Sequence, residues 1–434
     1  MQVGETAIGT ISKLIRFILR QPRDWKVTAA RSSSFRLFYQ MLLPYLSIYT
    51  LALGATGTQL GIVNSVGMAV AGIISPFTGW LIDRIGVKKI YLVGIVLLAV
   101  SWSIYGLAQS WPVIIIAMLA YWMGFRTSVH SCSVVCGNSL ASEDRVTAMS
   151  CCETLAVGLL GIMGPMLGAL LVTAFGGVNI DGIRPLFFIA LAGTIATFLL
   201  VLNQLSNRRW GSTDKIESGF WKDLSYVFRQ GRDLRLKRFI IIAVITYMPM
   251  GMIVPFTQPF ANEVKGADQF ILGAMVTGFA LTPLLFGIPL GRLADRIGRK
   301  KALYFIAPLF WASNLMLIWA PSPAFLIISG VLQGFFFISS VIVGAMQFEL
   351  VPQEHMGRWI GVIGFFWMLI SALAAFIAGV IWDNIGPQYV FLAIVGIDVF
   401  IRIPLLIGMP ETLNLRRGSA ANLVSPGRLE PPTG

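Results

Sequence analysis

Charged residues are scarce in this chain. Of its 434 residues, only 12% are Asp, Glu, Lys or Arg, whereas 56% are hydrophobic. A soluble globular protein of this length needs more polar surface, so this composition excludes a soluble fold. The mean hydropathy of +0.77 places the chain in a lipid bilayer.

Residues that carry catalysis or bind metals are also scarce. The chain has two His and four Cys. The adjacent Cys151 and Cys152 would point to different faces of a helix, so we expect neither a disulfide framework nor a metal site. The sequence contains no Gly-x-x-x-x-Gly-Lys-Ser/Thr loop, which an ATP-driven pump would need to hold phosphate. We therefore expect no enzyme activity, no metal and no cofactor.

Long apolar stretches dominate what remains. A helix that crosses the hydrocarbon core needs about 20 apolar residues, and twelve stretches of roughly that length can be counted. In the first half they are 35–53, 60–82, 90–107, 112–135, 149–175 and 186–202. In the second half they are 239–259, 270–293, 302–319, 325–346, 360–381 and 389–409.

The excess of positive charge has a topological cause. A net charge of +13 would suit a nucleic-acid partner, but the Lys and Arg residues fall almost wholly on alternate loops. The other loops carry only Arg184 and Lys265. We call the side that these loops face the base-poor side, and the opposite side the base-rich side. The base-rich side is predicted to be cytoplasmic, with both termini on it, in the plasma membrane and with no nucleic-acid partner.

One long interior connection divides the chain. Between the sixth and seventh stretches the composition changes to charged residues, among them Arg208, Arg209 and Lys215, which predicts a domain boundary. The predicted organisation is a cytoplasmic N-terminal arm at 1–33, a six-helix bundle at 34–203, a cytoplasmic linker at 204–238, a second six-helix bundle at 239–410 and a cytoplasmic tail at 411–434.

Two charged turns repeat each other 212 residues apart, as GWLIDRIGVKK from Gly79 and as GRLADRIGRKK from Gly291. A repeat at this distance indicates a duplication. The candidate gate residues in the two copies are Gly79, Asp83, Arg84, Gly86, Lys88 and Lys89, and Gly291, Asp295, Arg296, Gly298 and Lys300. A mere cluster of topogenic charge would explain the bases but not the two aspartates.

The repeated turn resembles the loop signature that the major facilitator superfamily carries between helices 2 and 3 and, more loosely, between helices 8 and 9. The resemblance covers nearly the whole chain. It implies an all-α membrane protein of twelve transmembrane helices in two pseudo-symmetric six-helix bundles, which transports a substrate by alternating access.

Physical roles can be given to the residues of this turn. Gly79 and Gly291 would allow helices to approach closely, and Gly86 and Gly298 would allow a sharp backbone turn. The carboxylates could cap the N-terminus of a neighbouring helix. The resemblance makes that neighbour helix 11 for Asp83 and, by symmetry, helix 5 for Asp295. Such contacts would close the cytoplasmic face and stabilise an outward-open state.

Helix 5 carries small residues at three- and four-residue spacing, namely Gly161, Gly164, Pro165 and Gly168. This spacing predicts close helix packing. The stretch resembles the helix 5 signature of the superfamily's proton-coupled drug exporters. The chain departs from that branch in two places, because Ala169 replaces the second Gly of a pair and Ala120 stands where an Arg is usual in helix 4.

Charges inside the membrane are costly, so they are candidates for function. Arg126 lies about 21 Å along helix 4 from Pro112, and Glu153 reaches a similar depth on helix 5. An Arg126 and Glu153 pair would bind substrate or exchange a proton, and a purely structural ion pair is the alternative. Asp398 and Arg402, spaced i, i+4 on helix 12, are predicted to be structural.

Further polar candidates lie on helices that line the cavity in this superfamily. They are Gln40, Tyr45, Tyr121, Tyr247 and Gln333. Arg36 near the start of helix 1 is also a candidate, although a side chain that extends to the lipid headgroups explains it equally well. The run from Met248 to Met252 contains Pro and Gly and is expected to loosen helix 7, which suits a gate.

These features together predict a secondary active transporter that exports a small molecule, with protons as the coupling ion. The alternatives are proton-coupled or facilitative uptake of a small organic solute, and a non-transporting sensor on the same fold. The expected partners are the small-molecule substrate, protons and the lipid bilayer, and the chain is expected to act as a monomer.

Overall fold

The computed structural model describes residues 17–140, 160–207, 234–350 and 356–412, and contains helices but no strand within those ranges. The first half forms α2 (Arg23–Leu42), α3 (Leu46–Ala52), α4 (Gly57–Ile85), α5 (Val87–Leu107), α6 (Trp111–Ser139), α8 (Gly161–Ala174) and α9 (Ile180–Gln204). The second half begins with α11 (Leu234–Thr246), α12 (Met248–Met252), α13 (Val254–Pro259), the π-helical turn η2 (Phe260–Val264), α14 (Gln269–Ile297) and α15 (Arg299–Trp319). It ends with α16 (Pro323–Gln333), α17 (Phe335–Leu350), α18 (Met356–Asn384), α19 (Pro387–Ile397), the π-helical turn η4 (Asp398–Arg402) and α20 (Ile403–Ile407).

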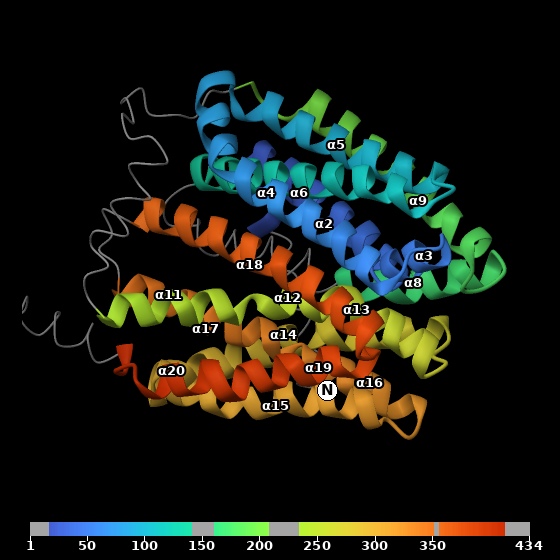
Figure 1. The fold of residues 1–434 in the computed structure, drawn as a ribbon. Coiled ribbons are helices and arrows are strands. Elements are labelled where there is room, and N and C mark those ends of the chain that lie inside the picture. Colours follow the sequence, from blue (N-terminus) through green and yellow to red (C-terminus); the bar gives the residue numbers. More distant parts are fainter. Residues whose placement is uncertain (1–16, 141–159, 208–233, 351–355, 413–434) are drawn as a thin grey trace, which may run out of the picture.

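The helices gather into two bundles, one from each half of the chain (Figure 1). Ten helical segments of the described chain are long and apolar enough to cross a membrane. The first expected stretch is divided between α2 and α3, and the fifth is represented by the shorter α8, because its beginning lies outside the described residues. The all-α fold of two pseudo-symmetric bundles is therefore confirmed.

Several expected spans are interrupted. The seventh breaks at Tyr247 and again at Ile253, next to Pro249 and Pro255, because a proline removes a backbone donor and obstructs the preceding turn. The loosening predicted for this helix is confirmed. The sequence reading did not foresee the breaks near Pro44 and Gly334 or the π-helical turn η4 in the twelfth span.

The predicted domain boundaries mostly fall on residues that the structure does not describe. Most of the linker and of the tail lies outside the described residues, so those limits stay predictions. At the N-terminal end, α2 begins at Arg23, inside the stretch assigned to the arm. Its residues Trp25 and Ala29 are buried with Cys136 and Leu140 of the first bundle.

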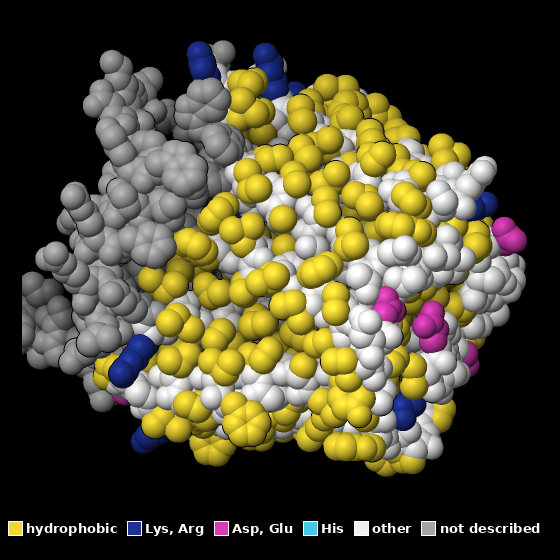
Figure 2. Space-filling view, in the orientation of Figure 1, with side chains coloured by type: hydrophobic (Ala, Val, Ile, Leu, Met, Phe, Trp, Pro, Cys, Tyr) yellow, Lys and Arg dark blue, Asp and Glu magenta, His cyan; other side chains and the backbone are white. Residues whose placement is uncertain are grey.

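The surface matches a lipid environment. Figure 2 shows hydrophobic side chains spread over most of the visible face, with the magenta Asp and Glu side chains gathered at one end. Large apolar residues such as Ile116, Leu170, Ile288 and Phe305 are more than half exposed. An apolar belt of this extent is costly in water and is favourable against acyl chains.

Glycines bring α4 of the first bundle against α18 of the second. A Cβ built on Gly61 would lie 2.5 Å from the carbonyl oxygen of Ala375, and one built on Gly379 would collide with the backbone of Gly57. Close backbone approach of this kind depends on residues without a side chain. The contact lies at the base-poor ends of both helices, where it joins the two bundles.

A second glycine seam involves α8, which packs against both α2 and α14. A Cβ on Gly164 would lie 2.7 Å from the carbonyl oxygen of Leu37, and one on Gly168 would collide with that of Met41. On the other face of α8, Gly273 of α14 packs on the carbonyl oxygen of Pro165. The spacing of small residues in helix 5 predicted close packing, and these contacts supply it.

Replacing Gly61 with Ala should destabilise the protein by about 1–3 kcal/mol, the usual cost of overpacking a close contact. The measurement is thermal unfolding of the purified protein in detergent. Gly287→Ala is the matched control, because Gly287 is also helical and a Cβ there would meet no atom within 4 Å. Equal melting temperatures for the two variants would contradict the close contact.

Candidate functional site: a cavity between the bundles

The first half of the site is a cavity with an empty volume of about 520 Å³, which we call the N-side cavity. Most of its wall is aromatic and apolar, and its polar atoms come from a few uncharged side chains. Its lining residues include Tyr39, Asn64, Trp102, Tyr105, Tyr121 and Trp122 from the first bundle. Met250, Val254 and Pro255 of the broken seventh span close it from the second bundle.

The second half, which we call the C-side cavity, has an empty volume of about 500 Å³ and lies mainly in the second bundle. Its polar wall consists of Thr257, Gln258 and Gln333, and the amide of Gln333 donates a hydrogen bond to Thr257 Oγ1 at 3.2 Å. Leu43 and Val254 line both cavities. The two spaces therefore adjoin, with an apolar divider of one residue from each bundle between them.

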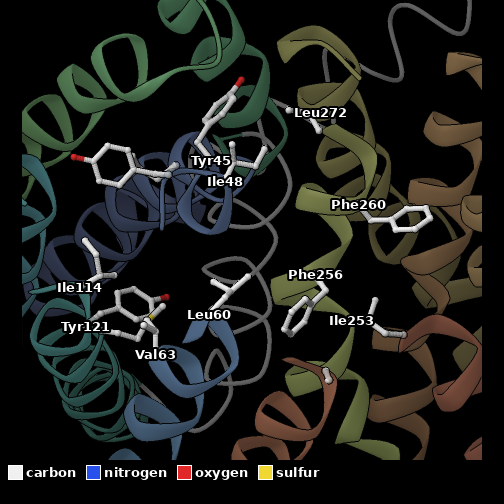
Figure 3. Packing of buried hydrophobic residues seen from close by; sticks show 14 of the residues in the cluster. Tyr45, Ile48, Leu60, Val63, Ile114, Tyr121, Ile253, Phe256, Phe260 and Leu272 are labelled. Atoms are coloured by element: carbon white, nitrogen blue, oxygen red, sulfur yellow. The ribbon is translucent and has the colours of Figure 1, made fainter. Parts of the chain in front are cut away.

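Aromatic rings order the N-side cavity. Tyr39 and Tyr121 stack with ring centroids 5.6 Å apart, and Trp102 lies at the same distance from Tyr121. Figure 3 shows the surrounding hydrophobic cluster, to which Leu60 and Tyr121 of the first bundle and Phe256 and Leu272 of the second contribute. Stacked rings are rigid, so the wall presents a fixed apolar surface.

Three polar atoms on the cavity walls have no hydrogen-bond partner within the described chain. They are Tyr105 Oη and Trp122 Nε1 in the N-side cavity and Gln258 Oε1 in the C-side cavity. Leaving a buried polar atom unpaired is costly. A bound molecule with a suitable donor or acceptor would recover that cost, so these atoms are candidate substrate contacts.

Both cavities lack charge among the residues that line them. No Asp, Glu, Lys, Arg or His belongs to either described wall. A cation or anion placed there would lose its hydration without gaining an opposite charge. The site as described therefore suits an uncharged, largely apolar molecule.

Arg126 lies on α6 but contacts both bundles. Its Nη2 donates to Ser75 Oγ on α4 at 2.8 Å, and its guanidinium carbon lies 5.7 Å from the ring centroid of Trp367 on α18. Its Nε is buried and has no partner among the described residues. The proposed partner Glu153 lies outside those residues, so the Arg126 and Glu153 pair stays a prediction.

The remaining sequence candidates fall into three places. Tyr121 and Gln333 line the N-side and C-side cavities respectively. Tyr45 donates to the carbonyl oxygen of Gln269 at 3.4 Å, which is a contact between the bundles rather than a cavity position. Gln40 is buried where α2 meets Gly164 of α8.

Tyr247 and Arg36 lie outside both cavity walls. The Tyr247 carbonyl oxygen accepts a hydrogen bond from Ser371 of α18 at 3.0 Å, and its ring lies 5.1 Å from that of Trp367. It therefore fixes the break in the seventh span. Arg36 is half-buried on α2.

The first charged turn ends α4 and starts α5. Gly86 adopts φ of +100°, which confirms that a glycine is needed for the sharp turn. Lys88 Nζ donates to the carbonyl oxygen of Leu205 at 2.7 Å, at the C-terminal end of α9. Arg84 and Lys89 are exposed. The side chain of Asp83 and the surroundings of Gly79 are not described, so the cap on helix 11 stays a prediction.

The second charged turn repeats this geometry. Gly298 has φ of +106°, and Lys300 Nζ donates to the carbonyl oxygens of Ile407 and Met409 at 2.7 and 2.8 Å. Cationic side chains at helix C-termini neutralise the negative end of the dipole. In each copy, therefore, a lysine holds the end of the last helix of its own bundle, a role that the sequence reading did not anticipate.

Acidic residues complete the second turn. Glu411 accepts backbone hydrogen bonds from Arg299 and Lys300 at 2.8 and 3.2 Å, and so caps α15. Asp295 forms an ion pair with Arg299, which also contacts Glu349 at 3.1 Å. Because the start of helix 5 is not described, a contact of Asp295 with it stays a prediction.

Two expectations about this turn need comment. Arg296 is exposed. A Cβ on Gly291 would meet no atom within 4 Å, so the close helix approach predicted there is wrong for the described conformation. Gly291 faces open space, because α14 has no neighbouring helix at this position.

The sequence reading missed an acidic cap between the bundles on the base-poor side. Asp383, near the end of α18, accepts hydrogen bonds from the backbone N–H groups of Gly57 and Thr58 at 2.9 and 2.7 Å. Thr58 Oγ1 in turn donates to the carbonyl oxygen of Gly379 at 3.2 Å. A carboxylate at a helix N-terminus satisfies unpaired donors and the positive end of the dipole. Asp383 thus fixes the first turn of α4 to the second bundle.

The cavity residues Asn64, Tyr105, Trp122, Thr257 and Gln258 were also missed. A signal existed, since uncharged polar residues inside apolar spans tend to face the protein interior. Many other polar residues in these spans only bond their own helix, as Thr194 and Thr246 do. The sequence alone could not separate the two groups.

Comparison with known proteins places the chain. The Major Facilitator Superfamily matches residues 32–235 and 239–420. The multidrug resistance protein MdtG of Citrobacter koseri is 29% identical over 298 residues, which are 65% of this chain and 70% of that protein. MdtG of Escherichia coli K12 is 28% identical over 275 residues, 61% of this chain and 64% of that protein.

Solved structures share the fold. A crystal structure of a variant of the nucleoside transporter NupG superposes with a TM-score of 0.76 at 15% identity, covering 89% of this chain and 99% of NupG. A D-xylose–proton symporter gives a TM-score of 0.67 at 13% identity, covering 89% and 98%. With both bundles matched in sequence and in architecture, the chain belongs to the Major Facilitator Superfamily and is a secondary transporter rather than an enzyme.

Proposed function

We propose that this transporter exports a small, uncharged, largely apolar molecule in exchange for protons. The observation that carries the proposal is the pair of adjoining cavities, whose walls come from both bundles and contain no described charge. Ligand pockets of roughly 300–1,000 Å³ with apolar walls and a few polar atoms are typical of small-molecule sites. A site between two bundles is exposed to alternate sides when the bundles rock.

The membrane orientation follows from the charges. We assign the base-rich side to the cytoplasm of a plasma membrane and the base-poor side to the exterior. On that assignment, the Asp383 cap and the Gly61 and Gly273 contacts hold the outer side closed. This supports an inward-facing conformation, from which a substrate of an exporter would be loaded.

Two observations favour export over uptake. The relatives named above are multidrug resistance proteins, and the α8 glycines resemble the helix 5 signature of proton-coupled drug exporters. The cytoplasmic contact proposed for Asp83 would then stabilise the opposite, outward-open state. Capping contacts on the two faces would alternate during the cycle.

The proposal is tested with purified protein in liposomes. Radiolabelled chloramphenicol serves as an uncharged aromatic probe, and tetraphenylphosphonium serves as a lipophilic cation. With an acidic lumen, an antiporter releases protons outward and should accumulate chloramphenicol inside. Tetraphenylphosphonium should not be accumulated, because the described cavity offers it no counter-charge. Protein-free liposomes are the control.

The other outcomes separate the rival functions. Accumulation only with an acidic exterior would indicate proton-coupled uptake, and flux that ignores the pH gradient would indicate facilitated transport. No flux of either probe would favour a sensor. Preferential accumulation of the cation would refute the uncharged substrate class.

Replacing Asp383 with Ala should shift the protein toward opening on the base-poor side. Loss of an N-terminal cap costs about 1 kcal/mol, roughly a fivefold change in the ratio of the two states. The measurement is the distance distribution between spin labels at Gln109 and Ser322, two exposed loop residues of different bundles on that side, in a variant without native cysteines.

Asp181→Ala is the matched control, because Asp181 is an exposed carboxylate on the same side. The long-distance population should grow in Asp383→Ala and stay unchanged in Asp181→Ala. An unchanged distribution in both variants would show that Asp383 does not hold this side closed.

A further inference from the structure

A buried ion pair lies in the twelfth span, away from the substrate cavities. Asp398 and Arg402 are 5% and 4% exposed. Arg402 Nη2 donates to Asp398 Oδ2 at 2.9 Å, and Arg402 Nε donates to Asp398 Oδ1. Trp311 of α15 also donates to Oδ2, at 2.6 Å. All the printed partners of the carboxylate are donors, which is the environment of an ionised group.

The pair lies near the middle of the membrane. Asp398 is eleven residues from Pro387, the first residue of α19, or about 16 Å along the helix. This is about half of a hydrocarbon core of about 30 Å. Coupling ions in secondary transporters bind near the midplane, and ionisable residues at this depth are expensive to keep.

The duplication supplies an internal comparison. The corresponding helix of the first bundle, α9, is continuous, and it carries no charged residue after Arg184. The fold therefore does not need a charged pair at this place in a bundle. Only the second copy has one, which points to a function beyond packing.

The backbone around the pair is irregular. Asp398 to Arg402 form the π-helical turn η4, and Pro404 follows in the first turn of α20. Because Pro404 has no N–H to donate to the preceding turn, the helix is weakened there. π-helical turns in α-helices occur frequently at functional sites. The carboxylate and guanidinium thus lie on a segment that can change its hydrogen bonding at low cost.

A small cavity connects the pair with the substrate site. Asp398 and Arg402 line it together with Thr246 and Ser339, and Ser339 Oγ accepts from Arg402 Nη1 at 3.3 Å. Pro249, Phe310 and Phe336 line both this cavity and the C-side cavity. A substrate in the C-side cavity and a proton at Asp398 would therefore act on the same wall.

Few other described groups compete for this role. No titratable or charged side chain other than Asp398 and Arg402 lines the small cavity. Among the described carboxylates, that of Glu349 is also buried, but it lies one residue from the end of α17 and binds Arg299 and Thr412. Glu153 of helix 5 lies outside the described chain and is included in the test.

We propose that Asp398 is the proton-coupling carboxylate of this transporter and that Arg402 displaces the proton when the ion pair re-forms. With the pair closed, the site has no net charge. A proton from the cavity converts the carboxylate to a neutral acid, Arg402 keeps its own proton, and the site carries one positive charge. When Arg402 returns, the acid gives its proton to water and the net charge is again zero. The inference rests on the proposed proton coupling.

The test compares Asp398→Asn, the double variant Asp398→Asn with Arg402→Gln, and Glu153→Gln with the unmodified protein in liposomes. Chloramphenicol is measured in two ways, as accumulation driven by an acidic lumen and as counterflow at equal pH, which needs no net proton movement. Asp383→Asn is the matched control, because it removes an exposed carboxylate outside the pair. Proton release on chloramphenicol binding is recorded in weakly buffered detergent.

Asp398→Asn should keep counterflow, lose gradient-driven accumulation to the level without a gradient, and lose proton release. The double variant should behave alike, and because it leaves no unpaired charge it covers the case in which the single variant does not fold. Asp383→Asn and Glu153→Gln should keep all three activities. Coupled transport by Asp398→Asn or by the double variant would overturn the proposal, as would loss of coupling in Glu153→Gln alone. If the unmodified protein shows no dependence on the gradient, the proposed function itself fails.

Discussion

The contact of backbone against backbone on the base-poor side is the constraint on which the rest of the structure depends. Gly61 and Gly379 let α4 and α18 touch, Gly273 and Pro165 do the same for α14 and α8, and Asp383 fixes the first turn of α4. In hydrocarbon there is no hydrophobic gain from bringing helices together, so close van der Waals packing and hydrogen bonds must supply the association. With one side closed in this way, the two bundles enclose the cavities between them.

Charge is distributed according to the same solvent. The bases of the repeated turns hold helix ends at the membrane surface, as Lys88 and Lys300 do, and the described cavity walls are uncharged. Charge within the described core is then concentrated in Arg126 and in the pair of Asp398 with Arg402. Substrate recognition and proton binding are separated in space but share one aromatic wall.

The sequence predicted the architecture well because its signals are of long range and strong. Apolar length, alternating basic loops and the repeated Asp-Arg turn each follow from the bilayer or from the duplication, and they located the helices. Cavity residues were harder to find, since Gln258 and Asn64 differ from Thr194 only in the direction that they face. Asp383 escaped notice because its meaning depends on Gly57 and Thr58, more than 320 positions away in the chain. The pair of Asp398 and Arg402 was recognised as a pair, but its neighbouring cavity and π-helical turn could be seen only in three dimensions.

Leu43 and Val254, which line both cavities, divide the binding space into two compartments. A ligand small enough for one compartment contacts mainly one bundle, so its binding free energy changes little when the bundles move relative to each other. A longer ligand must push both side chains aside and then touches both bundles at once. Only that ligand has a different affinity for the two conformations, and differential affinity is what shifts a conformational equilibrium. The divider therefore makes molecular length, more than chemical identity, the property that separates a cargo from a bystander.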